Sequence, residues 1–456
     1  MLFPSETMAR ACERHLRDRS DDSQASAIVR LTIRIDGSFK TQDDDRQQEN
    51  VSMVLHPQTL AAEAKAFWQH TGFGISSRFA AHWLKTAPFL GGEPERLPLK
   101  EARDAGLALG SRIAGLYSTG PDDVFLYHTG MSAMAHAASA IRRLGGEVGK
   151  GFRVVVFGFP YVDTFKVLSK VYGFDCVLYG HASARELDEL EAGLETGSRL
   201  DVVVTEFPGN PLLRSVHLAR LKALSRKHGF YIIIDDTIGT AVNLDLGSSY
   251  DLVCTSLTKM FSGACNVMGG SVVVGPRCRN RDSLREALSD LYEDTYFPLD
   301  VIVMNTNSVG FESRVQLASR NAEKVVDRLR HHRLVETVYY PRGSPTQHLY
   351  DDFRRPGAGY GYLLSIEFVE PAAATAFFDA LDVAKGPSLG TNFTICCAYT
   401  LLAHASELDW AAGYGVREHL VRISVGIEEE ESLLALVEVA LAAAELRCPV
   451  REGGLK

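Results

Sequence analysis

Short, uniformly apolar runs alternate with segments of helical spacing through the middle of the chain. Runs at 123–127, 153–157, 175–179, 201–205, 230–235, 251–255 and 271–274 are typical of buried strands. Apolar residues recur at helical spacing in 99–117, 133–144, 161–172, 184–195 and 217–228. Strands that are apolar on both faces need cover on both sides, so the pattern predicts an α/β fold, a mostly parallel sheet with helices on both faces.

The two ends of the chain show different patterns. After residue 300 we expect one long amphipathic helix over Val301–His332, strands at 334–340, 360–369 and 420–425, and helices at 371–381 and 428–446. These elements predict a smaller C-terminal α+β domain (301–456). The first 98 residues combine helical stretches at 9–16 and 59–70, a strand-like run at 28–35 and an acidic loop at 43–45. We interpret residues 1–98 as an N-terminal arm and inter-subunit segment, and 99–300 as a large ligand-binding domain.

Charge and composition narrow the range of functions. The 456 residues carry a net charge of −9, and no basic stripe offsets this acidity. The balance argues against nucleic acid as a partner. No apolar run approaches the ~20 residues of a membrane span, and Met1–Pro4 lacks the pattern that begins a signal peptide. We therefore expect no membrane partner and a cytoplasmic location.

The eight cysteines form no C-x-x-C pair, and several lie in apolar runs. They indicate buried, reduced thiols rather than a disulfide framework or a zinc site. The chain also has no H-E-x-x-H motif, so we expect no metal site.

Candidate functional residues follow several of the predicted strands. They are Thr129 with Gly130, Tyr161, Glu206 to Asn210, Asp235 to Thr237, and Ser256 to Lys259. In open α/β sheets, ligands bind beyond the carboxyl ends of the strands. Because all these residues fall at such ends, we expect them to form one site.

Their chemistry points to one cofactor. A partly desolvated Lys259 is a candidate amine for a Schiff base with an aldehyde, and Asp235, after a buried strand, needs a cationic partner such as a protonated pyridine nitrogen. Tyr161 could stack on an aromatic ring. Gly130, Met131, Ser256 and Thr258 could bind a phosphate, partly through the N-terminus of a helix. An aldehyde, a pyridinium and a phosphate together describe pyridoxal 5'-phosphate (PLP).

Six runs of sequence then match a known family in its order. They are Y-H-T-G-M-S-A at 127–133, T-E-F-P-G-N-P at 205–211, I-D-D-T at 234–237, T-S-L-T-K at 255–259, G-P-S-L-G-T at 386–391 and V-R-I-S-V-G at 421–426. On these runs the chain resembles the Cys/Met-metabolism family of PLP-dependent enzymes. Within this family it resembles the fungal cystathionine γ-synthases and their natural-product biosynthetic relatives.

The resemblance implies a fold-type-I PLP-dependent transferase, active as a homotetramer built from dimers that share active sites. It assigns Lys259 to the Schiff base and to proton transfer, Asp235 to the pyridine nitrogen, and Tyr161 to ring stacking and proton transfer. The other implied cofactor contacts are Gly130, Met131, Asn210, Thr237, Ser256, Thr258 and, from the neighbouring subunit, Arg78. On the substrate side, Arg422 with Ser388 would bind the α-carboxylate, and Ser76 would also lie there.

Three positions differ from many relatives of this family. Ser76 stands where a tyrosine often precedes the phosphate-binding arginine, Met260 stands where a tyrosine often follows the lysine, and Asn266 replaces an aspartate. Loss of a phenol leaves open which acid assists departure of the leaving group. It also leaves room for a bulkier second substrate.

The implied reaction is a γ-substitution on an O-acyl-L-homoserine, with O-acetyl-L-homoserine as the expected ester, through a vinylglycine-type intermediate. The acceptor would be the cysteine thiol or a carbon nucleophile such as acetoacetate. Alternatives within the class are a cystathionine β- or γ-lyase and an O-acetylhomoserine sulfhydrylase. A remote alternative is a serine hydrolase of the S-x-x-K type with Ser256 as nucleophile, but the S-D-N and K-T-G motifs that it needs have no downstream match.

Overall fold

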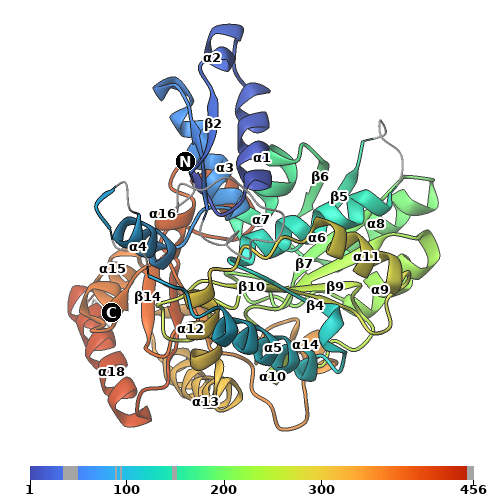
Figure 1. Cartoon of the computed structure of the whole chain (residues 1–456). Helices are drawn as coiled ribbons and strands as arrows, with labels where there is room; N and C mark the ends of the chain where they lie inside the picture. Colours follow the sequence, from blue (N-terminus) through green and yellow to red (C-terminus); the bar gives the residue numbers. More distant parts are fainter. Residues whose placement is uncertain (34–49, 88–89, 93–94, 146–150, 449–456) are drawn as a thin grey trace, which may run out of the picture.

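The computed structural model describes residues 1–33, 50–87, 90–92, 95–145 and 151–448. This part of the chain contains sheets of three, seven and five strands, arranged as Figure 1 shows. The acidic run predicted as a loop at 43–45 and the last two residues of the run at 28–35 lie outside the described residues.

The seven-stranded sheet forms the centre of the molecule, in the order β4-β10-β9-β8-β7-β5-β6. Its strands are β4 (Val124–Tyr127), β5 (Arg153–Phe157), β6 (Asp175–Tyr179), β7 (Val202–Glu206), β8 (Tyr231–Asp235), β9 (Leu252–Thr255) and β10 (Gly270–Val274). The strands from β9 to β6 pair in parallel, whereas β10 pairs antiparallel with β4 and with β9. The predicted α/β fold with a largely parallel sheet is confirmed.

Alternate side chains of the central strands point to opposite faces of this sheet. Val155 and Phe157 belong to a core cluster with side chains of α5 (Leu99–Leu116), α8 (Ala184–Glu195) and α9 (Leu218–His228). Val154 and Val156 belong to a second cluster with side chains of α6 (Gly130–Leu144) and α11 (Arg281–Leu291). Apolar helix faces therefore cover both sides, as the uniformly apolar strands require.

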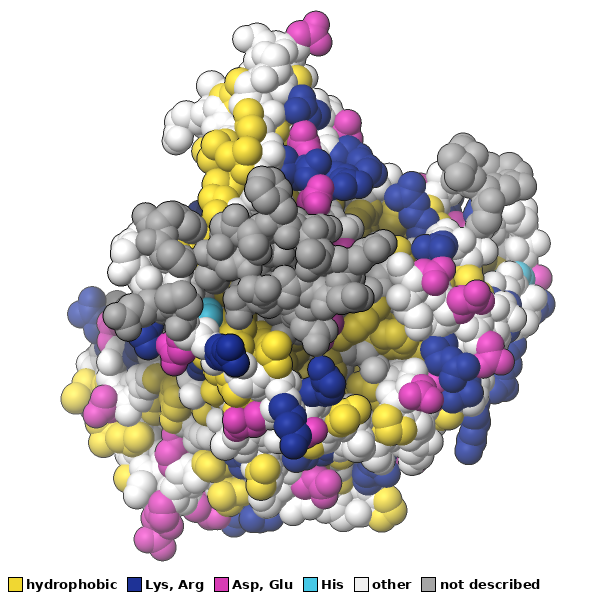
Figure 2. Space-filling view, viewed as in Figure 1, with side chains coloured by type: hydrophobic (Ala, Val, Ile, Leu, Met, Phe, Trp, Pro, Cys, Tyr) yellow, Lys and Arg dark blue, Asp and Glu magenta, His cyan; other side chains and the backbone are white. Residues whose placement is uncertain are grey.

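The N-terminal residues form a three-stranded antiparallel sheet of β1 (Leu2–Phe3), β3 (Val51–Leu55) and β2 (Val29–Ile33). Its helices are α1 (Glu6–Arg17), α2 (Asp22–Ser26), α3 (Ala61–Thr71) and α4 (Ser77–Thr86). Leu16 and Phe67 join the second core cluster, in which α3 packs against α6 and α1 packs against α3. In Figure 2, hydrophobic side chains gather over the N-terminal sheet.

The C-terminal part contains the five-stranded sheet, in the order β11-β12-β15-β14-β13. Its strands are β11 (Val335–Tyr339), β12 (Leu363–Phe368), β13 (Ala384–Lys385), β14 (Ile395–Ala398) and β15 (Val421–Ser424). The helices of this part are α12 (Pro298–Ser308), α13 (Phe311–Arg330), α14 (Gln347–Asp351), α15 (Pro371–Ala380), α16 (Tyr399–Ala403), α17 (Leu408–Gly413) and α18 (Glu430–Arg447). A smaller sheet-containing C-terminal part is thus confirmed, while the domain boundaries at 98 and 300 stay predictions.

Two predicted helices are corrected by the structure. The single helix expected over Val301–His332 is two helices, α12 and α13, because Gly310 between them has a left-handed φ of 75°. The helix expected at 161–172 begins as α7 (Val162–Lys166) and continues as a π-helical turn over Val167–Val171.

No helix within the described ranges combines the length and the hydropathy that crossing a membrane requires.

Candidate active site

The carboxyl ends of β7, β8 and β9 meet at one edge of the central sheet. Glu206 ends β7 and pairs in register with Asp235, which ends β8. Ser256 follows β9, and the chain then turns through Lys259 before it returns as β10. The expected convergence of these residues on one edge is therefore present.

Lys259 lies in this turn with its amine directed to the C-terminal part of the chain. Its Nζ donates a hydrogen bond to Ser388 Oγ at 3.0 Å. Burial, aided by the nearby Arg422 charge, lowers the pKa of Lys259 to about 8. A much larger fraction of this amine than of an exposed lysine is then neutral, and therefore nucleophilic, near physiological pH.

Arg422 lies in β15 and is only 3% exposed. Its Nη1 donates to Asn210 Oδ1 at 3.0 Å, and its Nη2 donates to the carbonyl oxygens of Pro387 at 2.6 Å and Ser388 at 3.1 Å. No carboxylate of the described residues lies within ion-pair distance of this guanidinium, although Arg417 and Arg78 both have such partners. A buried cation without a counter-ion favours an anionic ligand.

Asp235 is a half-buried carboxylate that also lacks an ion-pair partner among the described residues. Its Oδ1 accepts a hydrogen bond from Thr237 N at 2.9 Å, and Thr237 Oγ1 accepts one from Ser256 N at 2.8 Å. Burial raises the pKa of Asp235. The adjacent Asp236 is satisfied elsewhere, because it accepts hydrogen bonds from Tyr117 and Thr255.

Gly130 and Ser256 form a close contact at the N-terminus of α6. A Cβ atom on Gly130 would lie 2.7 Å from Ser256 Cβ, so no larger residue fits there without a shift. Thr129 caps this helix by accepting a hydrogen bond from Ser132 N at 2.9 Å, and Gly130 and Met131 begin it. The N–H groups of a helix N-terminus favour a phosphate.

The hydroxyl of Thr258, the remaining predicted phosphate contact from this turn, is hydrogen-bonded to the backbone of Gly269.

Glu206 connects two further predicted cofactor contacts. Its Oε1 accepts a hydrogen bond from Tyr161 N at 2.5 Å, and its Oε2 accepts one from Asn210 N at 3.0 Å. Burial and the neighbouring Asp235 raise the pKa of Glu206. Tyr161 itself is 44% exposed, so its ring is available for stacking. The sequence placed Glu206 among the candidate residues at the strand ends but assigned it no role in the site.

Arg78 and Ser76 are not joined to this network in the single chain. Both bind the buried carboxylate of Asp300, and Arg78 also donates to the carbonyl oxygen of Asn266 at 2.9 Å. Met260 is fully buried in the first core cluster. The residue after the lysine therefore contributes to packing in this chain.

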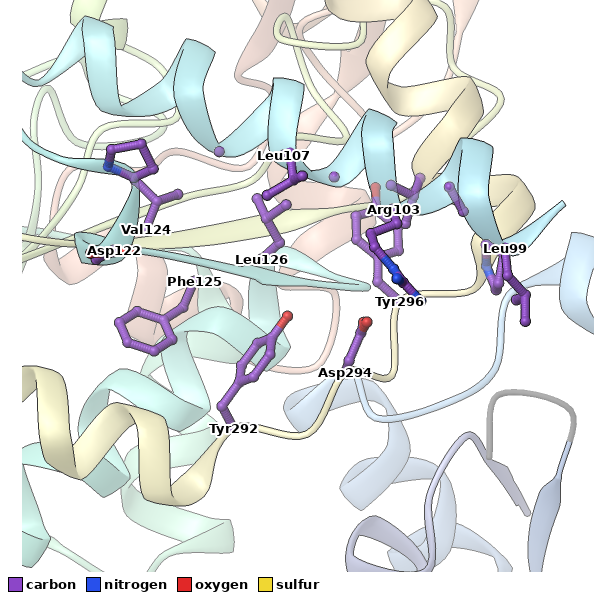
Figure 3. Close-up of a pocket in the computed structure, with 16 residues that line it drawn as sticks. Leu99, Arg103, Leu107, Asp122, Val124, Phe125, Leu126, Tyr292, Asp294 and Tyr296 are labelled. Atoms are coloured by element: carbon purple, nitrogen blue, oxygen red, sulfur yellow. The ribbon is translucent and has the colours of Figure 1, made fainter. Parts of the chain in front are cut away.

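A cavity of about 580 Å³ lies elsewhere, beside the edge strand β4 (Figure 3). Leu107 of α5, Leu126 of β4 and Tyr292 after α11 are among the residues that line it. None of the predicted site residues does so, and the candidate site is therefore the edge that carries Lys259.

The donor set of that edge fits PLP. Lys259 offers an amine with a lowered pKa, and Asp235 offers a half-buried carboxylate without a counter-ion among the described residues. The start of α6 at Gly130 offers backbone N–H groups. These three features match an aldehyde, a protonated pyridine and a phosphate.

Comparison with known proteins agrees with this geometry. Residues 106–442 match the Cys/Met metabolism PLP-dependent enzymes, and the chain belongs to this family. Within it, the chain is a cystathionine γ-synthase-like enzyme that uses PLP. Residues 1–76 match the fungal trans-sulfuration enzyme N-terminal domain.

Two fungal proteins and one solved structure illustrate the relationship. The chain is 34% identical to the cystathionine γ-synthase of Neurospora crassa, over 98% of this chain and 86% of that protein. It is 40% identical to the cystathionine γ-synthase-like protein ankD of Aspergillus thermomutatus, over 87% and 74% of the two chains. The crystal structure of the Xanthomonas oryzae cystathionine γ-synthase in complex with cystathionine superposes with a TM-score of 0.65 at 24% identity, covering 76% of this chain and 88% of that one. This structural similarity confirms the fold-type-I architecture.

Replacing Gly130 with a larger residue tests the proposed phosphate site at the start of α6. We expect Gly130→Ala to weaken PLP binding by about tenfold or more, because overpacking against Ser256 costs ~1–3 kcal/mol unless the helix start moves. Titration of the cofactor-free protein with PLP, followed by absorbance, measures this. Gly115→Ala is the matched control, since a Cβ there meets nothing within 4 Å. Equal PLP affinities for the two variants would contradict the assignment.

The pKa of Lys259 can be measured on the cofactor-free protein. Only the neutral amine reacts with acetic anhydride, so a lowered pKa moves the onset of acetylation to lower pH. We expect the rate at Lys259, followed by mass spectrometry, to rise with a midpoint at about pH 8. A midpoint near the ordinary value of 10.5 would show that the amine is fully hydrated.

Proposed function

We propose that this chain catalyses a γ-substitution on an O-acyl-L-homoserine, with O-acetyl-L-homoserine as the expected ester. The acceptor is the cysteine thiol or a carbon nucleophile such as acetoacetate. The observation that carries this proposal is the double role of Ser388, whose Oγ binds Lys259 Nζ while its carbonyl oxygen binds Arg422. An amino acid whose carboxylate binds Arg422 would therefore have its α-carbon close to the Lys259 amine.

Each of these groups suits one task in such a reaction. Arg422 would bind the α-carboxylate, because its buried charge has no carboxylate partner among the described residues. Lys259 would take a proton from Cα, release it and then take one from Cβ, since an amine with a pKa of about 8 both accepts and releases protons near neutral pH. The Cγ–O bond then breaks and the acyloxy group leaves as a carboxylate. The nucleophile forms the new bond to Cγ, and protons return to Cβ and Cα.

Other residues would hold the cofactor. PLP, when bound, supplies an electron sink for the bond that is broken at Cα. Asp235 and Thr237 would keep the pyridine nitrogen protonated, Tyr161 would stack on the ring, and Asn210 would lie near the phenolic oxygen. Gly130, Met131, Ser256 and Thr258 would bind the phosphate.

Arg78 would complete the phosphate site of a neighbouring subunit, and the enzyme would be a homotetramer with sites shared across each dimer. In support, Arg78 makes no contact with Lys259, Asp235 or Gly130 of its own chain in the described structure. The mass of the holoenzyme in solution tests the assembly.

The acceptor depends on the space next to the leaving group. Ser76 is a small residue whose hydroxyl is held at Asp300, so no phenol from this position occupies that space. A lyase or a sulfhydrylase would differ mainly in using water or sulfide at this step.

Product analysis tests this proposal directly. With O-acetyl-L-homoserine and either cysteine or acetoacetate, we expect release of acetate and a γ-substituted amino acid, identified by mass spectrometry. Arg422→Leu should lower kcat/KM by ~30-fold or more, because removing a buried ionic contact costs 2–5 kcal/mol. The control is Arg417→Leu, whose side chain is 61% exposed and binds Glu336. No acetate release with any nucleophile would overturn the γ-substitution.

A further inference from the structure

Arg422 has one more contact that the predicted site did not include. Its guanidinium lies over the ring of Tyr399, with Cζ 4.8 Å from the ring centroid. This distance lies within the ~6 Å over which an aromatic face attracts a cation. Hydrogen bonds to Asn210, Pro387 and Ser388 act on the nitrogens, whereas the ring acts on the flat face.

Tyr399 is itself firmly held. It is 5% exposed, follows β14 directly, and donates its backbone N–H to Leu420 O at 3.0 Å. Its ring belongs to a small core cluster that includes Phe159, two residues before Tyr161. Trp410 and His404 extend the aromatic packing around Phe159. The ring is thus a rigid platform that joins the Arg422 side of the site to the Tyr161 side.

The hydroxyl of Tyr399 makes no hydrogen bond with any described residue, so the ring is the part of this side chain that contacts the site. We propose that Tyr399 is a positioning residue that fixes the plane of the Arg422 guanidinium for the carboxylate of an α-amino acid. This inference rests on the proposed carboxylate-binding role of Arg422.

The test compares two ligands of the holoenzyme that have no leaving group. L-2-Aminobutyrate carries the carboxylate, and propylamine is the same molecule without it. Binding of each is followed by the absorbance of the bound cofactor. The ratio of the two affinities reports the carboxylate contact and does not depend on the fraction of folded protein.

We expect Tyr399→Leu to weaken L-2-aminobutyrate about 2- to 30-fold, the range for loss of a cation–π contact, and to leave propylamine unchanged. Tyr399→Phe should keep the wild-type ratio, as should Trp410→Leu, which alters the same aromatic cluster away from Arg422. In an Arg422→Leu background, Tyr399→Leu should have no further effect on the ratio.

An unchanged ratio in Tyr399→Leu, or equal weakening of both ligands, would overturn the positioning role while leaving the proposed function in place. An unchanged ratio in Arg422→Leu would instead show that Arg422 does not bind the carboxylate. That result would overturn both proposals.

Discussion

Arg422 is buried without a carboxylate partner among the residues that the structure describes, and the candidate site depends on this constraint. Taking a cation out of water costs several kcal/mol unless other groups replace its hydration. Here Asn210 in the loop after β7, the carbonyl oxygens of Pro387 and Ser388, and the ring of Tyr399 do so. Because these groups come from separate parts of the chain, the charge can be held only where the central and C-terminal sheets meet.

The negative charges of the site also come from neighbouring elements of the fold. Glu206 and Asp235 lie side by side at the ends of β7 and β8, where burial raises the pKa of each. Glu206 accepts hydrogen bonds from the backbone N–H groups of Tyr161 and Asn210, whereas Asp235 has no ion-pair partner in the described part of the chain. Separated anionic and cationic groups of this kind suit a ligand with a pyridinium at one end and a carboxylate at the other.

The sequence predicted the central sheet well because apolar runs specify buried strands and polar residues follow their carboxyl ends. Lys259, Asp235 and Gly130 could be identified for the same reason, and family motifs extended the set to Arg422 and Ser388. The break at Gly310 was missed because the apolar spacing continues across it. Tyr399 was missed because its contact with Arg422 arises from pairing between β14 and β15, which no local pattern encodes. The differences at Ser76 and Met260 were visible in the sequence, but only the structure shows Met260 in the core and Ser76 on Asp300.

Lys259 is the residue proposed to hold the cofactor at the edge formed by β7, β8 and β9. Reduction of the holoenzyme with borohydride, followed by proteolysis and peptide mass mapping, tests this role most directly, because reduction fixes the cofactor to the amine that carries it. The predicted result is a pyridoxyl modification on the peptide that contains Lys259, absent from Lys259→Ala. Modification of a different lysine in the wild-type enzyme, or no modification in a protein saturated with PLP, would contradict the account.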